Sequence, residues 1–191
     1  MGFFSKIFGS KNPIESMSID ELKIMEIKLT NKIEELQTEV RSIEKEIQIL
    51  FEKAKNAKSK SEEVSLARRI KTLLQKKEMK LNAQAQLEKE LRAVSNLLIL
   101  KEYEEDLKSA GVWDKLRKLD PEQLEKWLIS KNLEAKNRDE LVSSVIEMTS
   151  MAMEVEYEED LYEILDAIRA VKEGNMEPED AEKMLREKKF E

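Results

Sequence analysis

The chain has 191 residues, a net charge of −7, 39% charged residues and only 5% aromatic ones. It has no cysteine and no histidine, which excludes thiolate and imidazole ligands for zinc, disulfides, and the usual nucleophile and base pairs of enzymes. With only four glycines and three prolines, its abundant Glu, Lys, Leu and Ile residues predict an all-α protein with long helices.

The opening segment, residues 1 to 12, is predicted to contact a membrane. In a short helix its apolar side chains would share one side, with a lysine beside them: Phe3, Phe4, Ile7, Phe8 and Lys6. Adhesion by one copy is expected to be weak and reversible, and many copies in a polymer would strengthen it by avidity. The alternative is that these side chains dock on the protein's own helices. Because Lys6 stands where a myristoylation signal has Ser or Thr, we expect no lipid anchor.

Residues 13 to 110 are predicted to form a long antiparallel, coiled-coil-like hairpin of two helices. Ser18 and Glu21 have the spacing of a capping box and mark the start of the first helix. Its apolar seam settles into steps of three and four residues, as in a coiled coil. That seam comprises Leu22, Met25, Leu29, Ile33, Leu36, Val40, Ile43, Ile47 and Leu50.

The seam lapses between Phe51 and Leu66, where Asn56, Ser59 and Ser61 can cap helix ends. We expect a tight turn here, and the alternative is one unbroken helix. The second helix continues with a matching seam of Leu66, Ile70, Leu73, Leu81, Leu87, Leu91, Val94 and Leu98. Each helix would then cover the apolar stripe of the other.

Shorter helices are predicted to follow over residues 111 to 153, packing on the hairpin or extending from it. Gly111 ends one segment, and Asp120 with Pro121 opens another as an N-cap followed by proline. Residues 154 to 191 are predicted to form acidic regulatory helices. One helix would end at Gly174, and a last one would run from about Pro178 to Lys188.

Charge is separated along the sequence. Ten basic residues gather around the hairpin turn, against three acidic ones: Lys53, Lys55, Lys58, Lys60, Arg68, Arg69, Lys71, Lys76, Lys77 and Lys80. An acidic run without any base follows near the end: Glu154, Glu156, Glu158, Glu159, Asp160, Glu163 and Asp166. The basic region could hold anionic lipid, a neighbouring subunit, nucleic acid or the chain's own acidic tail, or it could be a solvated face.

These features together resemble the ESCRT-III family, including its archaeal cell-division members. The resemblance rests on the opening MGFFSKIFG, the basic first half of the second helix, LARRIKTLLQKKEMKLNAQAQLEKEL, and the acidic helices behind it. It implies subunits that stack into membrane-bound filaments for cell division, vesicle budding or transport, or repair. The phage-shock-protein A family is similar in its hairpin and amphipathic start, but usually lacks so distinct an acidic tail helix.

The resemblance also implies an AAA ATPase that grips a C-terminal helix through a helical docking domain. Residues on the offsets of that family's ATPase-binding helix are Glu158, Leu161, Leu165, Ile168 and Arg169. Ile164 stands where the family has a central Arg. The last helix, with Leu185, is an equal candidate for this contact.

The predicted function is thus a membrane-remodelling polymer subunit whose acidic tail regulates assembly. A soluble coiled-coil module that binds nucleic acid or protein clients is the alternative. We expect no enzyme and no cofactor, since no phosphate-binding loop or pair of distinguished carboxylates occurs. No stretch reaches the roughly 18 apolar residues of a spanning helix, and the opening is too short for a secretory signal. The expected location is the cytoplasm, peripheral on the inner membrane face.

Overall fold

A computed structural model shows the fold of this chain. The structure describes residues 2 to 188, and the side chains of residues 2 to 152 and 164 to 185 within them. These residues form helices and no strand, which confirms the all-α class. The helices are α1 (Phe3–Phe8), α2 (Pro13–Ser16), α3 (Ile19–Lys55), α4 (Lys60–Glu102), α5 (Glu104–Ser109), α6 (Trp113–Arg117), α7 (Pro121–Ser130), α8 (Arg138–Lys172) and α9 (Pro178–Lys188).

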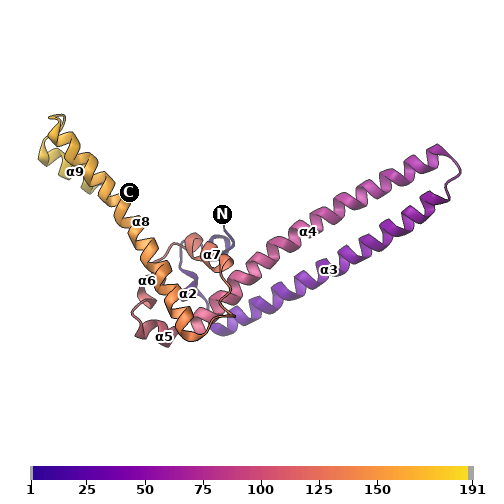
Figure 1. Ribbon diagram of the computed structural model, residues 1–191, viewed down its shortest axis with the longest axis horizontal. Helices are drawn as coiled ribbons and strands as arrows, with labels where there is room; N and C mark the ends of the chain where they lie inside the picture. Colours follow the sequence, from indigo (N-terminus) through magenta and orange to yellow (C-terminus); the bar gives the residue numbers. More distant parts are fainter. Residues whose placement is uncertain (1, 189–191) are drawn as a thin grey trace. The chain divides into compact units, whose positions relative to one another are not determined.

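The predicted hairpin is confirmed, with α3 and α4 running side by side to a shared turn (Figure 1). The capping box at the start of α3 is present: Glu21 N–H donates to Ser18 Oγ at 3.2 Å, and Ser18 N–H donates to Glu21 Oε2 at 2.8 Å. At the turn, Glu62 N–H donates to Ser59 Oγ at 3.2 Å. The Asn56 side chain donates back to the Glu52 carbonyl at 3.2 Å. These side chains form hydrogen bonds with backbone N–H and carbonyl groups at the two helix ends that meet at the turn. The alternative of one unbroken helix is therefore excluded.

The seam of the hairpin is apolar on α3 and mixed on α4. Seven of the nine predicted α3 residues are buried: Leu22, Leu29, Ile33, Val40, Ile43, Ile47 and Leu50. On α4 the prediction is wrong at Leu81, whose side chain is 42% exposed. Lys77, Lys80 and Gln84 occupy the half-buried positions in this stretch. They follow Leu73 at steps of four, three and four residues, so they share its face of the helix, and Leu81 does not.

A compact base surrounds the end of the hairpin where the chain enters α3 and leaves α4. Here α7 packs on α4, α1 packs on α7, and α2 and α5 both pack on α6. Many side chains with no exposure lie in this region: Phe4, Leu22, Leu97, Leu100, Leu107, Leu116, Leu124 and Leu128. Asp120 caps α7 as predicted, accepting from Glu122 N–H at 3.0 Å and Gln123 N–H at 3.2 Å.

The chain divides into two compact units, Met1–Arg138 and Asp139–Glu191. The first unit therefore holds the opening segment, the hairpin and the short helices together. The predicted boundary between residues 153 and 154 falls inside α8.

In the second unit, residues that we expected to form two helices form the single helix α8. No Gly or Pro interrupts this stretch, and like charges four residues apart oppose a helix only weakly.

The predicted stop at Gly174 is confirmed: Gly174 adopts φ 74°, Asn175 N–H donates to the Ala170 carbonyl at 3.1 Å, and α9 begins at Pro178. A left-handed glycine with this hydrogen bond is the Schellman ending of a helix. Ala167 of α8 and Ala181 of α9 are buried.

Candidate functional site

The opening segment forms the short helix α1, but its apolar side chains are not exposed together. Phe4 has no exposure, Phe3 and Phe8 are half-buried, and Ile7 is 43% exposed. The ring of Phe4 lies 5.9 Å from that of Phe3 and 5.7 Å from that of Phe8, centre to centre. Phe4 is therefore not accessible in this conformation, and the membrane contact of the opening segment stays a prediction. Helical spacing does place the four residues on one side, but α7 supplies a surface of the protein itself for that side.

Polar contacts fix α1 on α7. Phe3 N–H donates to Glu125 Oε1 at 2.9 Å, and Phe4 N–H donates to Glu125 Oε2 at 2.6 Å. Gly2 N–H donates to Glu122 Oε1 at 3.4 Å. A carboxylate from another helix thus satisfies the free N–H groups at the start of α1, through charge-assisted bonds.

Glu125 was not among the predicted functional residues, although its position on the apolar face of α7 is unusual for a carboxylate. Pro121, Leu124 and Leu128 form the buried stripe of α7, and Glu125 lies within that stripe with only 7% exposure. A carboxylate on the apolar face of an amphipathic helix needs hydrogen-bond donors when it is buried. The sequence alone does not show that these donors are backbone N–H groups more than a hundred residues away.

The turn end of the hairpin carries most of the predicted cations on its surface. Three of the ten form ion pairs with α3: Arg69 with Glu46 at 3.8 Å, Lys77 with Glu44 at 2.6 Å, and Lys80 with Glu39 at 2.5 Å. The other seven have exposed side chains and make no ion pair with the chain as far as it is described: Lys53, Lys55, Lys58, Lys60, Arg68, Lys71 and Lys76. The structure therefore separates cations that hold the hairpin together from cations that face solvent.

Apolar side chains are exposed in the same region. Ile49 is 55% exposed, Phe51 is 58% exposed, and both line a shallow hollow with Lys45, Lys53 and the half-buried Leu66. Two helices can each cover only one stripe of the other, so apolar residues off the seam stay in solvent. The turn end thus offers positive charge and apolar surface together.

The predicted ATPase-binding residues lie on two helices. The side chains of Glu158 and Leu161, and most of the acidic run, are outside the described residues. Leu165 and Ile168 of α8 are 40% and 47% exposed, while Leu185 of α9 is half-buried. Arg169 is paired with Asp166 at 3.9 Å. Two apolar side chains one turn apart are thus available on α8, and whether they bind an ATPase stays a prediction.

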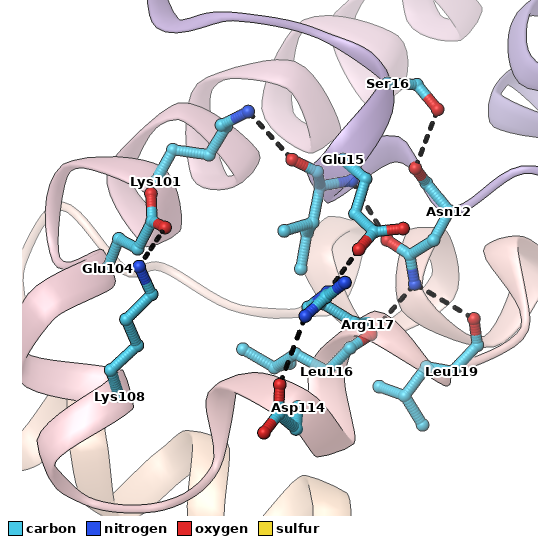
Figure 2. Close-up of polar contacts among 11 residues, drawn as sticks. Asn12, Glu15, Ser16, Lys101, Glu104, Lys108, Asp114, Leu116, Arg117 and Leu119 are labelled. Atoms are coloured by element: carbon cyan, nitrogen blue, oxygen red, sulfur yellow. Dashed lines mark hydrogen bonds and ion pairs between the residues drawn. The ribbon is translucent and has the colours of Figure 1, made fainter.

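A cluster of charged and amide side chains that the sequence did not predict ties the linker around α2 to α4 and α6 (Figure 2). The Lys101 ammonium donates to the Ile14 carbonyl at 2.7 Å and to the Met17 carbonyl. The Asn12 side chain donates to the carbonyls of Leu116 at 2.8 Å and Leu119 at 3.1 Å. Burial lowers the pKa of Lys101, and the nearby carboxylates of Glu104 and Glu21 oppose that shift.

The remaining charges of this cluster pair with one another. The Arg117 guanidinium contacts Glu15 and also lies 3.2 Å from Asp114. Lys108 lies 2.7 Å from Glu104, whose hydrogen bond raises the pKa of that lysine. They line a cleft of about 550 Å³. Because each of these groups already has a partner on the protein, the cluster holds the linker in place and offers no free group for chemistry.

No family model, curated protein or solved structure matches the chain. Among the described helices, none is both long and apolar enough to span a bilayer.

Proposed function

We propose that this protein is an ESCRT-III-like subunit that assembles on anionic membrane surfaces in the cytoplasm and remodels or severs the membrane. The observation that carries the proposal is the set of seven exposed, unpaired cations at the turn end of a long hairpin. A long two-helix arm that presents positive charge and apolar side chains at its end suits a surface of negative head groups.

The size of this attraction fits reversible binding. Each Lys or Arg near an anionic bilayer contributes about 1 kcal/mol, so several cations together give an appreciable but salt-sensitive affinity. The exposed Ile7 and the half-buried Phe3 and Phe8 would add a shallow apolar contact. Assembly into a filament multiplies both contributions, because each bound copy raises the effective concentration of membrane for its neighbours.

Regulation by the second unit belongs to the same proposal. Its acidic helix α8 carries charge opposite to that of the turn end, and Leu165 and Ile168 are exposed on it. Such a helix could compete with lipid for the basic region or be gripped by an AAA ATPase with a helical docking domain. We therefore expect the acidic unit to limit assembly.

A soluble module that binds nucleic acid is the second candidate, and the burial of Phe4 favours it. With Phe4 inside the protein, the opening segment has less apolar surface for a bilayer. The exposed cations would attract nucleic-acid phosphates through the same long-range field.

Vesicle flotation separates the two candidates. Reversing two exposed charges at the turn, Lys58→Glu with Lys60→Glu, should reduce binding to vesicles of phosphatidylcholine and phosphatidylserine by about tenfold or more. The matched control reverses two exposed lysines on α3 near the base, Lys28→Glu with Lys32→Glu, and should float nearly like the unchanged protein.

Equal losses of vesicle binding in both variants would show that binding depends on the net charge of the protein, and would contradict a specific role of the turn end. No flotation of the unchanged protein at low salt, together with retardation of nucleic acid in a gel, would establish the second candidate instead.

A further inference from the structure

The structure holds the membrane-directed segment in a closed position, and we infer that Glu125 is the latch that keeps it there. In the closed state Glu125 fixes the start of α1 on α7, and the Phe4 side chain is fully buried. In the open state α1 would leave α7 and offer Phe4 to a bilayer. The inference rests on the proposed membrane function and adds a control of access to it.

The hold is concentrated in very few groups. Both carboxylate oxygens of Glu125 accept hydrogen bonds from backbone N–H groups, at 2.9 Å and 2.6 Å, and the Phe4 ring is fully buried. Helix α1 has only six residues. A helix of this length is not stable in water by itself, so its structure depends on the docking. Removing one of these groups should therefore affect the whole segment.

A bilayer could take over both parts of the hold. The Phe4 ring would insert into the acyl region. Phosphates or water at the head groups would accept hydrogen bonds from the N–H groups that Glu125 no longer binds. A bilayer would thus reduce the difference in free energy between the closed and open states, and a differential interaction of this kind shifts their populations.

Gly2 offers an independent way to disturb the latch. A Cβ atom at this position would lie 2.6 Å from Oε2 of Glu125, closer than a normal contact. The backbone of Gly2 has φ −68° and ψ 167°, which any residue adopts. Gly2→Ala therefore adds no backbone strain and acts by displacing the end of the Glu125 side chain.

Hydrogen exchange of the full chain without vesicles tests the hold itself. Glu125→Gln keeps the size of the side chain but removes the charge, and Gly2→Ala acts from the other side. In each variant the amides of Phe3 and Phe4 should exchange about tenfold faster or more. Gln123→Ala, on the exposed face of α7, is the control and should leave them unchanged. Unchanged exchange in both Glu125→Gln and Gly2→Ala would overturn the latch.

Flotation with vesicles of phosphatidylcholine and phosphatidylserine tests the consequence. Glu125→Gln should bind several-fold more than the unchanged protein, and adding Phe4→Ser should abolish the gain. Faster exchange without a gain in flotation would overturn the control of access, while the proposed membrane function would stand if the unchanged protein floats. Should neither protein float, the proposed function fails as well, so the two failures are distinguishable.

Discussion

The two ends of the hairpin bury their residues to different extents. At the base, Leu97 and Leu100 of α4 have no exposure, because α7 packs on the same helix. At the turn end, within the first unit as described, the apolar cluster is built from α3 and α4, and the best-covered residue of α4 there, Ile70, keeps 8% exposure. In addition, Phe51 and Leu74 remain about half exposed in this region, at 58% and 49%.

The difference shows how one pair of helices serves two purposes. Packing on several sides makes the base a core, since a side chain there loses contact with water on all faces. Packing on one side makes the turn end an arm, which is held by a single seam and by ion pairs such as that of Lys77 with Glu44. The arm can therefore carry exposed charge and apolar side chains without weakening the core.

Truncating one apolar residue in each region gives the largest expected effect. Leu97→Ala should lower the free energy of unfolding by about 2 to 5 kcal/mol, as fully buried leucines do. Ile70→Ala should cost less, because its site lies near solvent and can close around the smaller side chain. Urea denaturation followed by far-UV circular dichroism measures both. A larger loss for Ile70→Ala would contradict the division into core and arm.

Replacing a buried amide at the base should have an intermediate effect. The Asn96 side chain donates to the carbonyls of Leu128 at 2.7 Å and Lys131 at 2.9 Å, and so joins α4 to the end of α7. Asn96→Ala should cost about 1 to 3 kcal/mol, since two carbonyls lose their donor. Asn82→Ala, at an exposed position of the same helix, should change stability by less than about 0.5 kcal/mol. Equal thermal stability of the two variants would show that the amide does not join the helices.

The smallest expected effect is electrostatic and depends on pH. A hydrogen bond from the backbone N–H of Ser18 lowers the pKa of Glu21, with further contributions from the Ser18 side chain and Lys101. A lowered folded pKa means that the stabilisation is complete above the unfolded pKa and is lost as pH falls through the folded one. Glu21→Gln should thus melt slightly below the unchanged protein at neutral pH, with the difference disappearing in acid. A difference that grows on acidification would contradict this role of the carboxylate.

Local chemistry allowed the sequence to determine the two long helices of the hairpin and several helix ends. Ser18 with Glu21, Asp120 with Pro121, and Gly174 all act on backbone groups within a few residues, so their effects need no knowledge of the fold. The α3 seam was predictable for a similar reason, because a continuous stripe at helical spacing has to face a partner. The ten basic residues were equally visible as a group.

Only the tertiary structure decided which surfaces remain free. The sequence places Phe4 on an apolar stripe, but in the fold Phe4 is buried where α1 packs on α7, and Glu125 caps α1 from a distant part of the chain. In the same way, the pairing with α3 divided the basic residues, so that Lys77 and Lys80 hold the arm while Lys58 and Lys60 face solvent. Periodicity places side chains on one face of a helix, but whether that face meets protein, water or lipid depends on contacts between residues far apart in the chain.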